Sequence, residues 1–316
     1  MSQADRSLND EKLVCAIDLG GTHLRAALVD QNGNIVSRYK QKTPIANDPD
    51  VIVQAIIAAV NECQQSQDDR QVGAVSVVVP GTVNAEEGKI VKAPNVSALD
   101  EFNLCEALSS QLDLPALLEN DANAAAVGEM WMAAARGRRT IVCVTLGTGV
   151  GGGIILAGKL WRGVDGAAAE VGHMCVEPFG GVACTCGGRG CLEVYASATA
   201  IVRITKEASP RHPESKLKLD QLTSEAIYLA GKQGDKLALE VFHRMGIYLG
   251  IGIANLINIL NPEMIVIGGG VANGWDLFEG DMHHQVAERA FPLLAARVKI
   301  VRAECGDDAG LFGAAR

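Results

Sequence analysis

The chain of 316 residues has no uninterrupted apolar segment of the roughly eighteen residues that a membrane-spanning helix requires. Its first dozen residues are polar and charged, whereas an export signal carries an apolar core there. We therefore expect a cytoplasmic protein with no membrane partner. Hydrophobic residues make up 48% of the chain, enough to bury large cores, and the length predicts two domains.

Positive charge is also scarce, since 28 Lys and Arg against 37 Asp and Glu give a formal net charge of −9. Such a chain lacks the general attraction that nucleic acid or an anionic membrane surface requires. We expect no nucleic-acid partner, and an anionic substrate must be held by local groups. The 35 glycines gather in clusters that suit close approach of the backbone to a ligand, at 20–21, 147–153, 180–190 and 268–270.

Two common nucleotide-binding motifs are missing. No Gly-x-Gly-x-x-Gly follows the first predicted strand, and no Gly-x-x-x-x-Gly-Lys-Ser/Thr occurs. The chain begins instead with a predicted hairpin (14–18 and 24–29), a strand at 35–40, a helix at 50–63 and a strand at 72–79. This order differs from the beginning of a Rossmann fold.

The pattern of strand, glycine-rich turn and strand recurs at 141–156, which indicates a duplication of the first hairpin. Backbone N–H groups of Gly20 to Thr22 and of Gly147 to Gly149 are suited to cradle phosphate oxygens without a lysine. Asp18 precedes the first turn, where a carboxylate either holds magnesium against nucleotide phosphates or forms the turn. The rest of the chain mixes strands and helices, which predicts two α/β lobes. Its predicted strands are 115–118, 264–267 and 298–301, and its predicted helices 104–112, 122–135, 197–207, 237–260, 280–290 and 308–315.

Three of the nine cysteines form a cluster with a histidine. Cys184, Cys186 and Cys191 follow His173 in a segment interrupted by glycines, with the spacing His-x10-Cys-x-Cys-x4-Cys. Four such ligands suit a closed tetrahedral zinc site, although the spacing is not that of a standard finger. The alternatives are reduced thiols in a loop or a disulfide in an exported protein, and the odd cysteine count disfavours a disulfide framework. Cys175 is a weaker candidate ligand.

Asp121 is the candidate general base, because it lies between a predicted buried strand and a helix, where a carboxylate reaches a ligand crevice. The same position suits a helix N-cap, but Asn120 and the glycine-rich turns favour catalysis. Glu170 and Glu193 bracket the metal loop, residues 173–191. They are either solvated acids or paired acceptors for the hydroxyls of a sugar. His173 has one ring nitrogen for the metal and another for a neighbour or ligand.

Several motifs in this order resemble those of the ROK group of repressors, unassigned reading frames and sugar kinases. They span 17–22, Pro80-Gly81, 119–125, 146–153, 170–173, 184–193 and 267–270. The resemblance implies a hexokinase and actin-like ATPase fold of the ribonuclease H-like type, an α/β protein with an active-site cleft between two lobes. It implies a small domain at 1–119, joined by a C-terminal helix at about 307–316, and a large domain at 120–306 with the zinc loop at 173–191.

The resemblance further implies ATP-dependent phosphorylation of a hexose at its 6-hydroxyl, with glucose as the expected sugar and a homodimer as the expected assembly. Asp121 would deprotonate the hydroxyl. The sugar would be bound by Gly81, Asn95, Asn120, Asp121, Glu170, His173 and Glu193. Structural Zn²⁺ would be held by His173, Cys184, Cys186 and Cys191. ATP with Mg²⁺ would be bound by Asp18, Gly20, Gly21, Thr22, Gly147, Thr148 and Gly149, and its adenosine by Gly268, Gly269 and Gly270.

Two alternatives stay open. A sugar-responsive transcription regulator shares this fold and metal loop, but it needs a helix-turn-helix, and only about a dozen residues precede Val14. A kinase for N-acetylglucosamine, N-acetylmannosamine, mannose or fructose keeps the same motifs. The cysteine loop favours ATP over polyphosphate as the phosphate donor.

Overall fold

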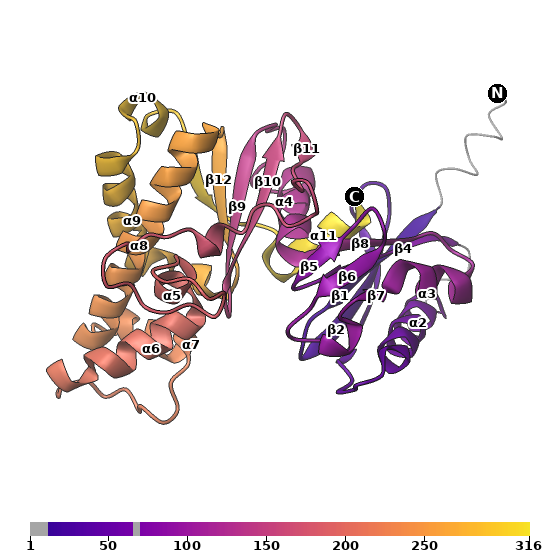
Figure 1. Cartoon of the computed structure of the whole chain (residues 1–316), viewed down its shortest axis with the longest axis horizontal. Coiled ribbons are helices and arrows are strands. Elements are labelled where there is room, and N and C mark those ends of the chain that lie inside the picture. Colours follow the sequence, from indigo (N-terminus) through magenta and orange to yellow (C-terminus); the bar gives the residue numbers. More distant parts are fainter. Residues whose placement is uncertain (1–11, 66–69) are drawn as a thin grey trace. The chain divides into compact units, whose positions relative to one another are not determined.

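The structure, a computed structural model, describes residues 12–65 and 70–316, whose contacts form two compact α/β units (Figure 1). The described residues of unit 1 come from Met1–Gly137, Leu160–Ala168 and Asp307–Arg316, and unit 2 comprises Arg138–Lys159 and Ala169–Gly306. The contacts place helix α4 (Asp121–Met132) in unit 1 together with the C-terminal helix α11 (Ala309–Ala315). The domain boundary predicted after residue 119 stays a prediction.

Unit 1 is built on a five-stranded sheet in the order β3-β2-β1-β4-β8. Its strands are β1 (Leu13–Leu19), β2 (His23–Val29), β3 (Ile35–Lys42), β4 (Val72–Val79) and β8 (Ala116–Asn120). The first three form an antiparallel meander, whereas β4 runs parallel to β1 and β8 parallel to β4. Because side chains alternate along a strand, Cys15 and Ile17 face one core and Ala16 faces the other.

Helices cover both faces of this sheet. Helices α2 (Pro49–Gln65) and α3 (Leu104–Leu112) pack on one face, and α4 and α11 on the other. Helices α4 and α11 touch closely, since a Cβ on Gly313 would lie 1.7 Å from the carbonyl oxygen of Ala124. A small antiparallel sheet of β5 (Thr82–Asn84), β6 (Lys89–Lys92) and β7 (Phe102–Asn103) also belongs to unit 1, and the sequence does not predict it. A short 3-10 helix, η1 (Ser97–Leu99), lies between β6 and β7.

Unit 2 repeats this strand order in the sheet β11-β10-β9-β12-β13. Its strands are β9 (Ile141–Leu146), β10 (Val150–Leu156), β11 (Lys159–Leu160), β12 (Met264–Gly268) and β13 (Lys299–Arg302). Strands β9 and β10 are antiparallel, and β12 runs parallel to both β9 and β13, so the predicted duplication of the hairpin is present. The sequence predicts the second strand of the hairpin from residue 153, but it begins at Val150, because Gly151 to Gly153 pair with β9.

Helices pack against one another and the sheet in the large core of unit 2. They are α5 (Glu193–Ala196), α6 (Ala198–Ala208), α7 (Ser224–Lys232), α8 (Lys236–Leu260), α9 (Trp275–Arg289) and α10 (Pro292–Ala295). Unit 2 also contains the 3-10 helices η2 (Val171–His173), η3 (Ser209–Arg211) and η4 (Gly270–Gly274). The chain passes from unit 2 to unit 1 within the 3-10 helix η5 (Gly306–Asp308). The sequence predicts the α9 helix from residue 280, but it begins at Trp275 and continues through Gly280.

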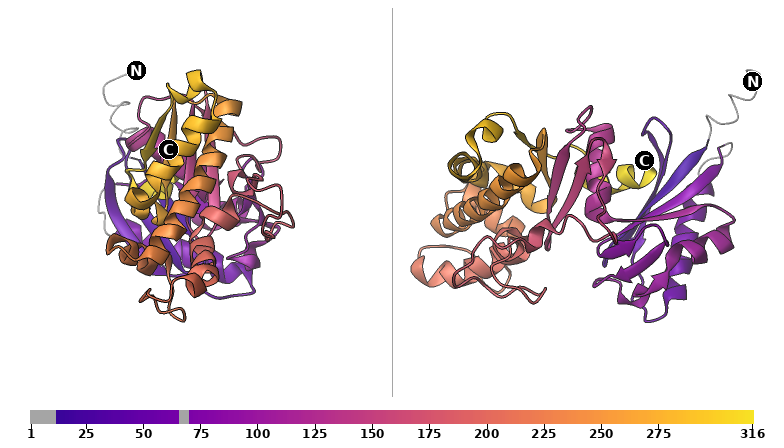
Figure 2. Two further views of the ribbon diagram at one scale, coloured as in Figure 1. Left: turned by 90° about the vertical axis from the view of Figure 1, so that its left-hand side faces the viewer. Right: turned by 45° about the horizontal axis from the view of Figure 1, so that its top comes forward.

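Helix α8 is the one described helix whose length and composition would also allow it to cross a membrane. Of its most apolar window, 61% is buried inside the protein. It lies beside α9 in both views of Figure 2, and a Cβ on Gly250 of α8 would lie 2.6 Å from the carbonyl oxygen of Met282 of α9. Its apolar composition therefore serves the core of unit 2.

Candidate functional site

In unit 1, the candidate residues gather where parallel strands end. Asp18 on β1 lies opposite Val78 on β4, and Val79 lies opposite Asn120 on β8. Carboxyl ends of parallel strands share one edge of a sheet, where ligands of open α/β sheets bind. The register therefore brings Asp18, the turn after β4 and the start of α4 to the same edge.

The start of α4 decides between the two interpretations of Asp121. The N-cap is Asn120, whose Oδ1 accepts hydrogen bonds from the backbone N–H groups of Ala122 and Asn123 at 2.9 and 3.0 Å. Asp121 is the first helical residue, and its Oδ1 accepts from the N–H of Ala122 at 2.9 Å. The capping alternative is wrong for Asp121, because Asn120 fills that role. The N-terminus of a helix favours a negative charge there.

The other unit 1 candidates pack around the same edge. Asn120 donates from Nδ2 to the carbonyl oxygen of Gly81 at 2.9 Å. Gly81 has φ +150°, and a Cβ there would lie 2.2 Å from the carbonyl oxygen of Lys92, so the site requires glycine. A Cβ on Gly21 would lie 2.8 Å from the Cβ of Asn95. The structure thus links Asn120 to Gly81, and Asn95 to the first glycine turn.

Asp18 has a partner that the sequence argument missed. Arg25 lies directly opposite it on β2 and donates from Nη2 to its Oδ2. The side chains are 31% and 17% exposed for Arg25 and Asp18. A magnesium ion at Asp18 would therefore share this carboxylate with a guanidinium, which suits contact through water. The hairpin register was the available signal, because it places the two residues face to face.

In unit 2, the four predicted metal ligands converge. One ligand atom from each of His173, Cys184, Cys186 and Cys191 lies within 4.8 Å of the other three. The Sγ atoms of Cys186 and Cys191 are 3.7 Å apart, and Nδ1 of His173 lies 3.6 Å from Sγ of Cys184. Around tetrahedral zinc, two thiolates lie about 3.8 Å apart and a thiolate and an imidazole nitrogen about 3.6 Å apart. The residues present therefore fit a zinc ion.

The protonation of the thiols depends on their surroundings. A hydrogen bond from the backbone N–H of Gly188 lowers the pKa of Cys186, whereas burial raises the pKa of Cys191. A buried thiol becomes a thiolate readily only beside a cation. Cys175 is exposed and is not one of the four converging residues.

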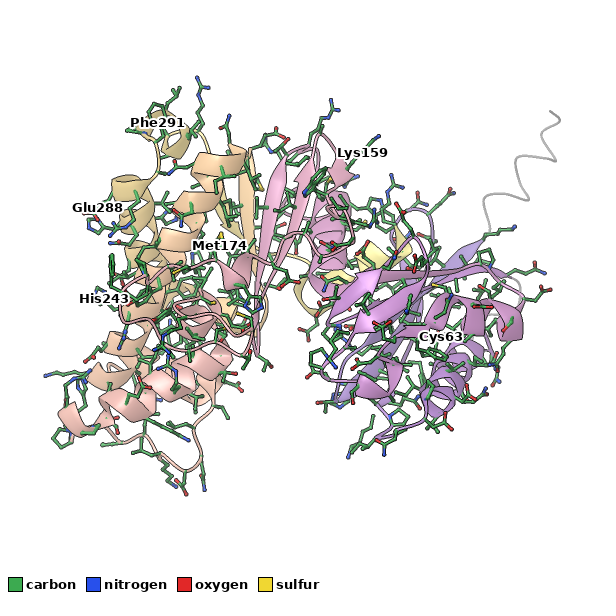
Figure 3. The ribbon with its side chains drawn as sticks, viewed as in Figure 1. Cys63, Lys159, Met174, His243, Glu288 and Phe291 are labelled. Atoms are coloured by element: carbon green, nitrogen blue, oxygen red, sulfur yellow. The ribbon has the colours of Figure 1, made fainter. Side chains whose placement is uncertain are left out.

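Two tyrosines support the metal loop, whose position Met174 marks in Figure 3. Tyr195 stacks on Tyr248 of α8 with ring centroids 4.0 Å apart, and its hydroxyl accepts a hydrogen bond from the N–H of Val182 at 3.0 Å. Tyr248 donates to Glu177 at 3.2 Å. Gly190 has φ +72°, and a Cβ there would lie 2.0 Å from the carbonyl oxygen of Glu177. The chain itself thus packs the loop onto α8.

The two candidate sugar glutamates differ in their surroundings. Glu193 Oε2 accepts a hydrogen bond from the N–H of Val150 at 3.0 Å, so it holds the end of the turn Gly147 to Gly149. Glu170 is 54% exposed, and its Oε2 lies 3.9 Å from Nε2 of His173, too far for a hydrogen bond. His173 therefore turns Nδ1 to the cysteines and Nε2 towards Glu170. The contact of Glu193 with the glycine turn is not predicted by the sequence.

The second glycine turn meets the Gly268 to Gly270 run. Strand β12 pairs Gly268 with Thr145 of β9, and a Cβ on Gly269 would lie 2.4 Å from the carbonyl oxygen of Leu146. A cavity of about 380 Å³ opens beside Gly270. It is lined by Ser224, Glu225, Tyr228, Leu229, Phe242, Gly270, Val271, Asn273 and Gly274. Its size and mixture of apolar and polar groups suit a purine nucleoside.

A repeated hairpin with a glycine turn in each unit, followed by parallel strands, defines an α/β protein of the hexokinase and actin-like ATPase type. The chain belongs to the ROK family, which its residues 14–316 match. It is 38% identical to the glucokinase of Halalkalibacterium halodurans over 304 residues, covering 94% of this chain and 92% of that enzyme. The predicted family and fold class are confirmed.

Two further relatives show the range of the family. A ROK family glucokinase from Streptomyces griseus, solved in complex with glucose and AMPPNP, superposes with a TM-score of 0.81 at 35% identity, covering 96% of this chain and 98% of that one. The xylose repressor of Bacillus subtilis is 29% identical over 300 residues, which cover 94% of this chain and 74% of the repressor. Both a kinase and a regulator class thus occur among the relatives.

Proposed function

We propose that this protein is an ATP-dependent glucokinase that transfers the γ-phosphoryl group of ATP to the 6-hydroxyl of glucose. Its likeness to glucokinases exceeds its likeness to a xylose repressor, 38% against 29% identity. The observation that carries the mechanism is the start of α4, where Asn120 caps the helix and Asp121 is the first helical residue. A carboxylate at that place is suited to accept a proton.

The reaction is phosphoryl transfer, in which positioning and charge neutralisation supply most of the catalysis. Asp121 accepts the proton of the 6-hydroxyl while the hydroxyl oxygen attacks the γ-phosphorus. Asn95, Asn120 and Gly81 of unit 1 bind and orient the sugar. The hydrogen bond from Asn120 to Gly81 and the packing of Asn95 against Gly21 fix these residues before substrate arrives, so little ordering is left for the moment of reaction.

Unit 2 supplies most of the remaining groups in this proposal, and unit 1 adds the turn Gly20 to Thr22. Glu170 and Glu193 accept hydrogen bonds from the sugar hydroxyls, and His173, whose Nδ1 faces the cysteines, donates from Nε2. Backbone N–H groups of Thr148 and Gly149 and of Gly21 and Thr22 bind phosphate oxygens. Those of Gly147 and Gly20 donate instead to the carbonyl oxygens of Gly149 and His23 and so shape the two turns. The cavity beside Gly270 takes the adenosine, with Tyr228 and Asn273 among its walls.

Two metals complete the proposal. Mg²⁺ with ATP, held near Asp18, would neutralise charge on the phosphates. Zn²⁺ on His173, Cys184, Cys186 and Cys191 would be structural, because all four tetrahedral positions are filled by protein ligands. Its effect on catalysis runs through Glu193, which follows Cys191 by two residues and contacts the glycine turn.

A coupled ADP-release assay tests the sugar. Glucose, N-acetylglucosamine, N-acetylmannosamine, mannose and fructose are compared as acceptors, with ATP and polyphosphate as donors. We expect the highest kcat/KM for glucose with ATP. The Asp121→Asn variant, purified in parallel, reports any contaminating host kinase. If glucose is the poorest acceptor, the glucose assignment is wrong while a sugar kinase is retained.

We further propose that the enzyme acts in the cytoplasm, in the first step of glucose breakdown, as a homodimer. The glucokinase relatives support the place in glucose breakdown, and the resemblance to the family implies the homodimer. Light scattering on the purified protein measures the assembly, and a mass of one chain, 33.2 kDa, would contradict the dimer.

A further inference from the structure

Glu119, the residue before Asn120, is a hydrogen-bonding centre outside the proposed substrate contacts. Its Oε1 accepts from the backbone N–H of Asn120 at 2.9 Å and from Nδ2 of Asn123 at 3.0 Å. Its Oε2 accepts from Nε of Arg162 at 2.7 Å. The Glu119 side chain is only 12% exposed, so its carboxylate depends on these donors.

Arg162 belongs to a segment far from α4 in sequence. Residues 160–168 belong to unit 1, although the residues before and after them in the sequence belong to unit 2. Glu170 follows this segment by two residues. Gly166, with φ +88°, docks this segment on β5, because a Cβ there would lie 2.3 Å from the carbonyl oxygen of Val83. The N–H of Ala168 donates to the carbonyl oxygen of Arg162 at 3.1 Å, which closes the segment into a loop.

The first turn of α4 is consequently fixed from three directions. Asn120 ties it to Gly81, Glu119 ties it to Asn123 within the helix, and the Arg162–Glu119 pair ties it to residues 160–168. Asp121 lies within this turn. A small displacement of a catalytic group lowers the rate steeply, because the reacting atoms must be aligned.

We propose that Arg162 and Glu119 are positioning residues for the base Asp121. This inference rests on the proposed sugar kinase function. The ion pair fixes the orientation of the turn that carries Asp121 and joins it to the segment leading to Glu170. The Arg162 side chain is 46% exposed, and Glu119 keeps the N–H of Asn120 and Nδ2 of Asn123 as donors when Arg162 is replaced. The loss of the ion pair should therefore lower turnover while thermal stability falls only slightly.

The experiment compares Arg162→Gln, Arg162→Lys, Glu119→Gln and the double variant Glu119→Gln/Arg162→Gln. Lys89→Gln is the matched control, because Lys89 forms an exposed ion pair with Glu101 in the same unit and contacts none of the proposed substrate residues. Each protein is measured for kcat, for KM of glucose and ATP across pH, and for Tm.

We expect Arg162→Gln to lower kcat about tenfold at every pH of the profile, because the variant misplaces the base without removing it. KM should change by less than about twofold, as expected when an interaction acts mainly in the transition state. Arg162→Lys should restore part of kcat, because lysine keeps the charge but lacks the planar guanidinium donor. The double variant should be no slower than Glu119→Gln alone, because both single variants remove the same ion pair.

Several results would overturn the inference. They are a kcat of Arg162→Gln equal to that of Lys89→Gln, additive losses in the double variant, and no recovery of kcat with lysine. A Tm loss of Arg162→Gln well beyond that of Lys89→Gln, or its failure to fold, also overturns the inference, because it marks a structural pair. A wild-type protein without sugar kinase activity refutes the proposed function itself. An active wild type with an unaffected Arg162→Gln variant refutes this inference alone.

Discussion

The two glycine turns occupy equivalent places in the repeated hairpins, yet different neighbours support them. In unit 1, Thr43 at the end of β3 holds the turn, since its Oγ1 donates to the carbonyl oxygen of Gly20 at 2.6 Å and its N–H to that of Thr22 at 3.0 Å. In unit 2, Glu193 accepts from Val150, and the N–H of Ala198 donates to the carbonyl oxygen of Gly147 at 2.8 Å.

The two turns depend on different parts of the chain. The unit 1 turn is supported by Thr43, which follows β3 of the same antiparallel meander. The unit 2 turn is supported by residues that directly follow the metal loop, including Thr199, whose Oγ1 donates to the carbonyl oxygen of Thr148 at 2.9 Å. The segment that follows the metal loop therefore supports the proposed phosphate site as well as contributing Glu193 to the proposed sugar site.

The largest expected effect is confined to unit 1. Asp121→Asn should lower kcat by about 10²- to 10⁴-fold, because general-base assistance is lost while the helix and its cap remain. Glucose affinity and zinc content should be largely retained, since asparagine is similar in size to aspartate and the other proposed sugar contacts and the metal ligands are unchanged. Steady-state kinetics and calorimetric glucose binding measure this. Asn120→Ala is the contrasting variant, which should lower stability by about 1 kcal/mol through loss of the cap. Near-normal turnover of Asp121→Asn would remove it from its role.

The second effect tests the dependence of unit 2 on its metal loop. Cys191→Ser should lower metal affinity by at least about 10- to 100-fold, the range typical of residues that only support a ligand. Activity should fall as well, because Glu193 and the second glycine turn lose their anchor. Elemental analysis should find about one zinc per wild-type chain. Cys175→Ser, which changes an exposed thiol outside the cluster, should keep the metal. A zinc-free and fully active wild type would contradict the structural role.

A smaller effect tests how far the second glycine turn depends on Glu193. A Cβ on Gly149 would lie 2.3 Å from Oε2 of Glu193, whereas a Cβ on Gly147 meets nothing within 4 Å. Gly149→Ala should therefore displace Glu193 from the N–H of Val150. Hydrogen bonds to charged acceptors are worth about 1.5–3 kcal/mol, so kcat/KM for ATP should fall about tenfold or more. Gly147→Ala should cost less in the same assay. Equal losses would mean that Glu193 does not support the turn.

The smallest effect lies at a surface pair away from both turns. Nε2 of His212 lies 2.6 Å from Glu240, and this contact raises the pKa of His212 and lowers that of Glu240. A raised histidine pKa stabilises the fold below the unfolded value of about 6.5, and the benefit is lost as pH rises through the folded pKa. His212→Gln should therefore lower Tm more at pH 6 than at pH 9.

Differential scanning fluorimetry at both pH values measures this difference. His284→Gln is the control, because that residue is 67% exposed and lies 3.3 Å from Glu288. Its Tm change should be small at both pH values. A His212→Gln loss that is equal at pH 6 and pH 9 would show that the protonated histidine does not stabilise the fold.

Prediction from sequence succeeded where a few neighbouring residues carry the information. Each long element with a clear period, such as α8, formed near its predicted bounds. The short strands β5 to β7 escaped prediction because two to four residues show no period. The start of α9 was misplaced, since Gly280 within a helix resembles a helix boundary.

The sequence by itself determined the family, the repeated hairpin and the grouping of His173 with three cysteines, because these depend on short motifs whose order survives in the chain. Only the tertiary structure decided that Asn120 and not Asp121 caps α4, that Glu193 holds the second turn, and that Arg162 reaches Glu119. Each of the last two contacts joins residues 43 positions apart. Such contacts depend on strand register and loop docking, which local pattern does not specify.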